Sequence, residues 1–185
     1  MKKCNVANNA EAYSGMGETH LVNGNYDKAI ECYEKAIELN PKLAIAHNNI
    51  GIAYSNKGDY DKATKHYEKA IELDPEYADP HYNMGNDFLD RGSYEKAIES
   101  YEKTIELNPE LDIAYYNIGL AYIKKCDYEK AIESFKKTIE LTPNFAEAYS
   151  NMEVAYYNKG EKDKAAECRQ KAQAINLIYD PHPMI

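Results

Sequence analysis

Asparagine recurs along the chain with a period of 34 residues, and its side chain is the first candidate for a binding function. The row contains Asn49, Asn83, Asn117 and Asn151, whereas Gly15 stands at the corresponding place near the N-terminus. A carboxamide carries both donors and an acceptor, so it can pair with the N–H and the C=O of a peptide backbone. A regularly spaced row of carboxamides therefore predicts a surface that grips an extended peptide whatever its side chains are.

Other chemistry is not indicated by the residue spacings. The chain contains no Ser/His/Asp set, phosphate-binding loop or paired-carboxylate constellation, and its many acidic residues belong to a repetitive surface pattern. None of the four cysteines has CxxC spacing, so neither a zinc site nor a disulfide framework is expected at Cys4, Cys32, Cys126 and Cys168. We therefore expect no catalytic residues, no metal and no cofactor.

The segments around each asparagine carry helix and turn signals. In residues 44–77, His47, Ile50 and Tyr54 are spaced by three and four positions, which places them on one face of a helix. A second run with helical spacing begins at residue 60. Between the two runs, Gly58 can adopt a left-handed C-cap and Asp59 can cap the next helix. Each unit is thus predicted to consist of two antiparallel helices.

Small residues and prolines repeat with the same period as the asparagines. Proline closes four units, at Pro41, Pro75, Pro109 and Pro143. Glycine is expected where the two helices of a unit cross closely, and it recurs at Gly17, Gly51, Gly85 and Gly119. One such helix pair cannot bury its own apolar face, but five stacked pairs share a continuous core.

This pattern resembles the tetratricopeptide repeat (TPR), a helix-turn-helix unit of 34 residues. The usual tryptophan near the start of the unit is replaced by packing residues, namely Tyr13, His47, His81, Tyr115 and Tyr149. The resemblance implies an all-α fold, a right-handed α-solenoid of five helix-turn-helix repeats. It predicts a single domain over residues 10–178, with tails at 1–9 and 179–185. The repeats are expected at about 10–43, 44–77, 78–111, 112–145 and 146–178.

The resemblance also places the asparagine row. In TPR arrays the first helix of each repeat lines a concave groove, where the row would face solvent, similar to the asparagine ladder of protein O-glycosyltransferases. Asparagine is also the consensus residue of this position in repeats with no known ligand, so a purely structural role stays open. The neighbours on the same face favour a peptide with apolar side chains, and they are Ile52, Tyr82, Asn86, Tyr116, Leu120 and Val154.

Charge and composition restrict the partners. TPR co-chaperones that hold acidic tails need a clamp of Lys and Arg, but the matching positions are Ser14, Glu18, Asn49, Asp79 and Asn83. The net charge of -9 argues against nucleic acid or an anionic membrane as the main partner. The N-terminal residues lack the apolar segment of a signal peptide, and no stretch has transmembrane length, so a cytoplasmic location is expected.

The fifth unit departs from the repeat at three positions. Glu153 replaces the glycine, Arg169 replaces the facing aromatic residue, and Leu177 stands in place of the proline. The two charged residues are predicted to pair across the helix crossing, and the polar second helix is typical of a terminal cap. Asp180 and the prolines that follow it are predicted to end the helical structure.

These observations together predict a non-enzymatic protein-interaction scaffold. Its partner would be a protein or peptide, bound in the groove as an extended peptide or as a helix. Two alternatives stay open: a structural array that self-associates, and the substrate-selecting part of a larger protein glycosyltransferase.

Overall fold

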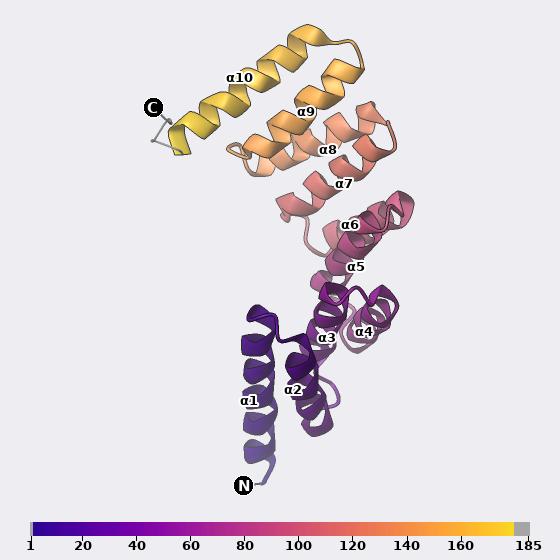
Figure 1. Cartoon of the computed structure of the whole chain (residues 1–185), viewed down its shortest axis with the longest axis vertical. Helices are drawn as coiled ribbons and strands as arrows, with labels where there is room; N and C mark the ends of the chain where they lie inside the picture. Colours follow the sequence, from indigo (N-terminus) through magenta and orange to yellow (C-terminus); the bar gives the residue numbers. More distant parts are fainter. Residues whose placement is uncertain (1, 180–185) are drawn as a thin grey trace. The chain divides into compact units, whose positions relative to one another are not determined.

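Ten α-helices make up the part of the chain that the computed structural model describes, which comprises the backbone of residues 2–179 and the side chains of residues 9–178 (Figure 1). No β-strand occurs among these residues. The helices are α1 (Lys2–Val22), α2 (Tyr26–Leu39), α3 (Ala44–Asn56), α4 (Tyr60–Leu73), α5 (Ala78–Asp90), α6 (Tyr94–Leu107), α7 (Asp112–Lys124), α8 (Tyr128–Leu141), α9 (Ala146–Asn158) and α10 (Lys162–Tyr179).

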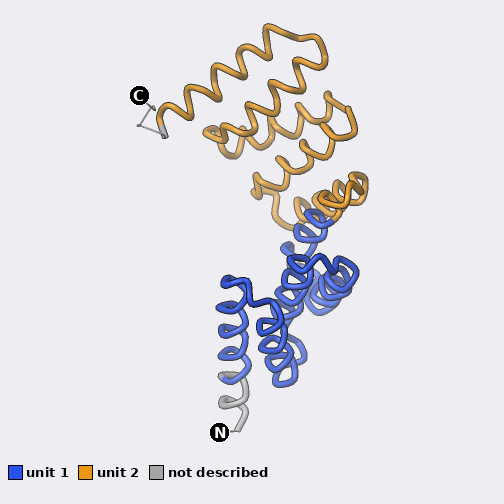
Figure 2. Tube along the Cα trace, in the orientation of Figure 1, with its two compact units in different colours: residues 1–87 blue, residues 88–185 orange. Residues whose placement is uncertain are grey.

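The chain divides into two compact units, Met1–Asp87 and Phe88–Ile185 (Figure 2). The division falls inside α5. Within each unit consecutive helices pack as antiparallel neighbours, α1 against α2 and α3 against α4 in the first, and α7 against α8 and α9 against α10 in the second. The predicted all-α solenoid of helix-turn-helix repeats is confirmed.

The turn inside each repeat requires a residue with positive φ. Glycine occupies this place in four repeats, with φ between 72° and 82° at Gly24, Gly58, Gly92 and Gly160. Cys126 adopts the same conformation in the remaining repeat, with φ of 59°, although it has a side chain. The predicted cap is present as well, because the Asp59 carboxylate accepts a hydrogen bond from the backbone N–H of Lys62 at 3.3 Å.

The predicted close crossing of the two helices is confirmed at three glycines. A Cβ atom at Gly51 would lie 2.4 Å from the ring of Tyr67, and one at Gly119 would lie 2.5 Å from the ring of Phe135. The same relation joins Gly17 to the ring of Tyr33. These rings are fully buried and have no space to move aside, so the absence of a side chain on the first helix is what allows each ring to pack.

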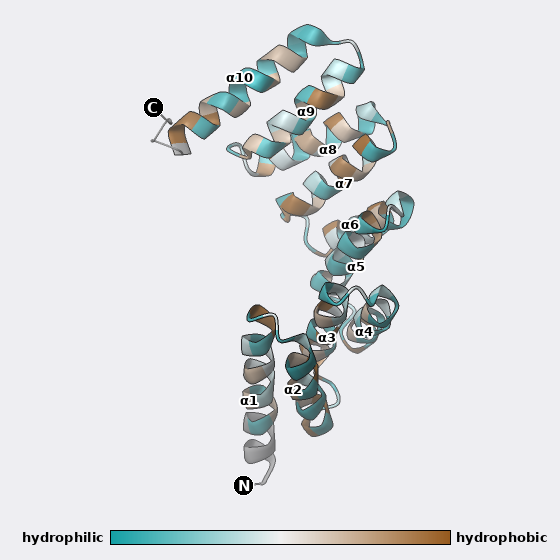
Figure 3. Cartoon of the chain, in the orientation of Figure 1, coloured by the Kyte–Doolittle hydropathy of each residue, from teal (hydrophilic) through white to brown (hydrophobic). Residues whose placement is uncertain are grey.

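Each unit has its own hydrophobic core. In the first unit Ala29, Tyr33, Ala46 and Ile50 pack together, while in the second unit the core surrounds Phe135 and extends through α9 to α10. Figure 3 shows hydrophobic residues recurring along α7, and others gathered at the C-terminal end of α10 beyond its hydrophilic middle. There Leu177 and Ile178 are largely exposed.

Neighbouring repeats are also joined by ion pairs that follow the repeat period. A lysine directly after or near the end of a first helix pairs with the acidic residue that opens the second helix of the preceding repeat. The described pairs are Lys57 with Asp27, Lys125 with Glu95 at 2.6 Å, and Lys159 with Glu129 at 2.9 Å.

The fifth repeat contains the predicted pair of charged residues. The Arg169 guanidinium donates from Nε and Nη2 to Oε1 of Glu153, at 2.8 and 2.5 Å. Leu177 lies within α10, which continues to Tyr179 where the other second helices end earlier. The predicted end of helical structure at Asp180 lies outside the described residues.

Candidate peptide-binding surface

The asparagine row forms hydrogen bonds between consecutive repeats. In the first unit Asn83 Nδ2 on α5 donates to Asn48 Oδ1 on α3 at 3.0 Å. Asn48 Nδ2 in turn donates to Asn49 Oδ1 at 3.3 Å. Asn48 is itself buried, with 3% of its surface exposed. The three carboxamides thus form a chain of hydrogen bonds that ties α3 to α5.

In the second unit the corresponding contact pairs an asparagine with a tyrosine. Asn151 Nδ2 on α9 donates to the Tyr116 hydroxyl on α7 at 2.9 Å and to the Glu147 carbonyl at 3.1 Å. Tyr116 packs its ring against Phe145, with centroids 4.9 Å apart, and burial raises the pKa of its hydroxyl. Tyr116 occupies the same repeat position as Asn48, so both contacts connect one place in the repeat to the asparagine of the next repeat.

The row is more buried than the sequence predicts. Asn117 has only 9% of its surface exposed, and Asn49, Asn83 and Asn151 are partly buried. The prediction that the row faces solvent is therefore wrong for Asn117. At Asn83 and Asn151 each carboxamide lies against a side chain of the preceding repeat, which accounts for their partial burial.

Asn49 also lies near the hydroxyl of Tyr33, the buried tyrosine of the repeat before it. Burial raises the pKa of Tyr33 to about 12, and the nearby Asn49 side chain opposes part of that rise. The Tyr33 hydroxyl nevertheless makes no hydrogen bond of ordinary geometry to the atoms that the structure describes. Asn49 therefore contributes to the contact between α2 and α3 as well as to the predicted surface.

The predicted apolar neighbours differ in how accessible they are. Val154 on α9 has 45% of its surface exposed and is the most accessible of them. The others are partly buried, namely Ile52, Tyr82, Asn86, Tyr116 and Leu120. Val154 follows Asn151 by three positions and Leu120 follows Tyr116 by four, so each pair shares one helix face. In the second unit the predicted residues consequently come together on α7 and α9, which are in contact.

Two further features concern metals and membranes. Among the described residues, no three His, Cys, Asp or Glu side chains are grouped so that they could hold a metal ion. No helix within residues 2–179 is both long enough and apolar enough to cross a membrane.

One feature of the second unit escaped the sequence reasoning. A cleft lies between α6, α7 and α8, on the side of the molecule formed by the second helices. The signal that could have indicated it is the replacement of His66 in the second repeat by Ser134 two periods later.

Family models match most of the chain. Models described as "Tetratricopeptide repeat" match residues 8–76, 66–99 and 113–145, and a model described as "TPR repeat" matches residues 85–125. Together with the helix pairs and the glycine-to-ring crossings, these matches decide the family. The chain is a tetratricopeptide repeat protein.

Solved TPR structures resemble this TPR protein over nearly its whole length. A MamA protein is 27% identical, with a TM-score of 0.82, and the match covers 96% of this chain and 98% of that one. A MamA fragment from Desulfovibrio magneticus RS-1 is 25% identical, with a TM-score of 0.82 and coverage of 93% and 97%. YrrB, described as a TPR protein with an unusual peptide-binding site, is 26% identical, with a TM-score of 0.73 and coverage of 93% and 87%. No curated protein sequence matches this TPR protein.

Proposed function

We propose that this TPR protein is a non-enzymatic scaffold that binds an extended peptide or a partner helix on the face formed by its first helices. The observation that carries the proposal is the surface of the second unit, where exposed Val154 lies beside Asn151 and across from Tyr116 and Leu120. The description of YrrB as a peptide-binding TPR protein supports the same class of ligand.

The hydrogen-bonding state of each asparagine determines what it offers to a peptide. Asn151 uses both of its N–H groups, on Tyr116 and on the Glu147 carbonyl, and this leaves Oδ1 as an acceptor for a peptide N–H. Asn83 uses one N–H on Asn48 and keeps a second donor and an acceptor. We therefore expect Asn83 to pair with both groups of a peptide bond and Asn151 to pair with the N–H alone.

The apolar residues supply the remaining affinity. Val154 and Leu120 present aliphatic surface, and Tyr116 is held in place by its hydrogen bond and by Phe145. A rigid aromatic ring beside aliphatic side chains is typical of the centre of a binding surface. We expect peptides with an aliphatic or aromatic side chain next to the segment that contacts Asn151.

The test is a selection from a peptide display library, followed by affinity measurements on the selected peptides. Val154→Asp should weaken binding about tenfold or more, because it places a charge in an apolar contact. Leu141→Asp is the matched control, since Leu141 is also an exposed aliphatic residue of the second unit but lies on a second helix. Both variants should melt close to wild type. Selected peptides that bind both variants as tightly as wild type would contradict the proposal.

A second candidate function is self-association. The C-terminal end of α10 exposes Leu177 and Ile178, with 69% and 73% of their surfaces accessible. Apolar surface of this kind at the end of an array can be covered by another copy. Light scattering coupled to size-exclusion chromatography would then show a mass above that of one chain, and Leu177→Glu with Ile178→Glu would reduce it. A single-chain mass for the wild type at high concentration would exclude this candidate.

A further inference from the structure

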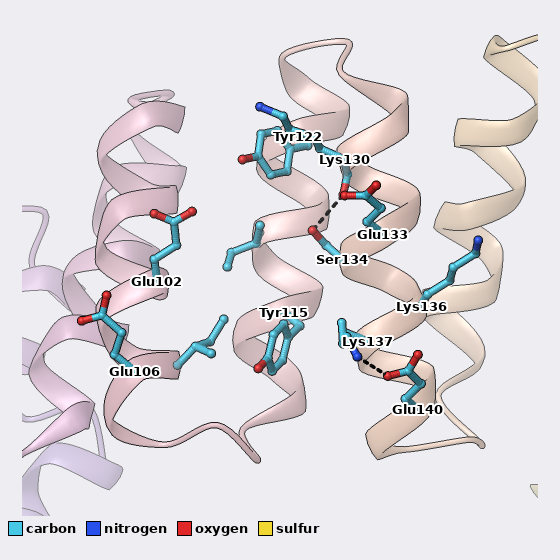
Figure 4. Close-up of a pocket in the computed structure, with 12 residues that line it drawn as sticks. Glu102, Glu106, Tyr115, Tyr122, Lys130, Glu133, Ser134, Lys136, Lys137 and Glu140 are labelled. Carbon is cyan, nitrogen blue, oxygen red and sulfur yellow. Dashed lines mark hydrogen bonds and ion pairs between the residues drawn. The ribbon is translucent and has the colours of Figure 1, made fainter.

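The cleft between α6, α7 and α8 has a volume of about 810 Å³. Helix α7 lines it with Tyr115, Ile118 and Tyr122, and Figure 4 shows the two tyrosines. Glu102 on α6 and Glu133 on α8 lie on its two walls (Figure 4). All these residues belong to the second unit. None of them is part of the proposed peptide-binding surface formed by Asn151, Val154, Tyr116 and Leu120.

The cleft lies where the fourth repeat has a small residue in place of an imidazole. In the second repeat the corresponding position is His66, whose ring stacks on both His47 and Tyr54 with centroids 5.6 Å away in each case. In the fourth repeat Ser134 stands there, and its hydroxyl turns back to donate to the Lys130 carbonyl at 2.9 Å. The space that an imidazole fills in the second repeat is thus left empty between Tyr115 and Tyr122.

The ring of Tyr115 also lacks the overlying cation that the rings at this position have in the first and fifth repeats. In the first repeat the Lys35 ammonium lies 5.8 Å from the centroid of the Tyr13 ring, and in the fifth Lys171 lies 5.7 Å from that of Tyr149. In the fourth repeat the equivalent lysine, Lys137, pairs with Glu140 at 2.5 Å. Within the described residues no cation lies over the Tyr115 ring.

The charges around the cleft are unbalanced in the negative direction. Lys130 lies 5.3 Å from the centroid of the Tyr122 ring and 3.7 Å from the Asp127 carboxylate, while Lys136 points away from the other labelled residues (Figure 4). By contrast, Glu102 and Glu133 form no ion pair with any residue that the structure describes. Among the described residues that line the cleft, the charges without an ion-pair partner are therefore the Glu102 and Glu133 carboxylates and the Lys136 ammonium, and the ammonium points away from the two carboxylates.

We propose that this cleft binds an arginine side chain from a basic segment of a partner protein. A guanidinium stacks on aromatic rings and pairs with carboxylates, and this cleft offers it the Tyr115 ring on α7 together with the carboxylates of Glu102 and Glu133 on its walls. The aliphatic part of the arginine would cover Ile105 and Ile118. The volume exceeds that of one side chain, so residues flanking the arginine also fit. This site is separate from the proposed peptide surface on α7 and α9.

The probe for the test is a fluorescein-labelled peptide of sequence Ser-Gly-Arg-Gly-Arg-Gly-Ser, measured by anisotropy with the full chain. The same peptide with citrulline in place of both arginines keeps the shape but removes the charge. We expect the arginine peptide to bind, and the citrulline peptide to bind about tenfold more weakly or less.

Two variants connect binding to the cleft. Glu102→Gln with Glu133→Gln should weaken binding about tenfold, because both counter-charges are lost. Glu110→Gln with Glu167→Gln removes the same charge from exposed residues outside the cleft and should change the affinity by less than about twofold. Ser134→His should abolish binding without lowering the melting temperature, since His66 shows how an imidazole fills this space, whereas Ser134→Ala should bind as wild type does.

Several results would overturn the proposal. Equal affinity for the arginine and citrulline peptides would show that charge is not recognised. An equal loss in the control double variant would show a general attraction to an acidic chain. Unchanged binding by Ser134→His, or no anisotropy change up to millimolar peptide, would exclude the cleft as the site. Loss of the arginine peptide in Val154→Asp would place it on the first-helix surface instead, so the two proposals fail separately.

Discussion

The second and fourth repeats have the same internal packing but different outer surfaces. Gly51 faces Tyr67 in one and Gly119 faces Phe135 in the other, with nearly the same spacing. On the outer side, however, His66 fills the space between two rings in the second repeat, and Ser134 leaves it open in the fourth. The comparison shows that the residues that build the helix pair are distinct from those that decide what its surface can bind.

The largest expected effect tests whether the two helix pairs are equivalent. Gly51→Ala and Gly119→Ala each place a methyl group against a fully buried ring, and each should destabilise the protein by about 1–3 kcal/mol. Gly15→Ala is the control, because nothing lies within 4 Å of its Cβ position in α1. It should raise stability by about 0.5–1 kcal/mol through helix propensity alone. Urea denaturation gives the free energy of unfolding of all three variants. An unchanged free energy for Gly51→Ala would show that the close helix crossing does not depend on this glycine.

A smaller effect is expected at the turns of the same two repeats. Cys126 has positive φ where Gly58 stands in the second repeat. Cys126→Gly should stabilise the protein by about 0.5–1 kcal/mol, because glycine adopts this conformation without steric cost. Gly58→Ala should have the opposite sign. Thermal melts of the two variants against wild type give the answer, and equal melting temperatures would mean that the turn of the fourth repeat has relaxed around its cysteine.

The filled surface of the second repeat should be sensitive to pH, in contrast to the open one. Burial lowers the pKa of both His47 and His66; the charge of Lys69 lowers that of His47 further, and the charge of His47 lowers that of His66 further. The unfolded chain therefore binds protons at higher pH than the folded one. The contribution of the histidines is complete above their ordinary pKa and is lost as the pH falls. We expect the melting temperature to drop between about pH 7 and pH 5.

The matched control gives the second repeat the residues of the fourth. His47→Tyr combined with His66→Ser removes both titrating groups and should flatten the pH dependence in this range. Lys62 and Lys69, the cations near the cluster, are present in both proteins, so they do not distinguish the variant from wild type. The same slope in both proteins would show that the acid sensitivity arises elsewhere.

The smallest effect is expected in the fifth repeat, where a charged pair replaces the glycine and ring. The Arg169 side chain is 57% exposed although that of Glu153 is only 22% exposed. Arg169→Ala should therefore lower the melting temperature only slightly, and less at high salt. Glu153→Gly with Arg169→Tyr restores the pattern of the other repeats and should raise it. A double-mutant cycle without coupling would show that the pair contributes nothing.

The sequence predicts the fold well because its signals are local and periodic. Gly58 and Asp59 mark a turn by their own chemistry, and the glycine at each crossing implies a ring opposite it. The pairing of Glu153 with Arg169 could be predicted for the same reason, since both stand at positions whose contacts are known from the other repeats. These inferences need only the spacing within one repeat.

The candidate sites were harder to predict because they depend on several helices at once. The hydrogen bond from Asn83 to Asn48 arises between repeats, where the sequence gives no distances. The cleft depends on Ser134, and also on Lys137 pairing with Glu140 instead of covering Tyr115. Lys137 could contact either Glu140 or Tyr115. The choice depends on the positions of the atoms, which the residue types alone do not give.

The ion pairs between repeats bear on how such a chain can change its length. Lys57 and Asp27 are 30 residues apart, and the pairs at Lys125 and Lys159 have the same separation. A repeat that is duplicated in tandem contains both partners of this ion pair. Its acidic residue can pair with the lysine of the repeat that follows, and its lysine can pair with the acidic residue of the repeat that precedes. Both new junctions would then be complete at once, so the gene can gain or lose single repeats without first evolving a new contact.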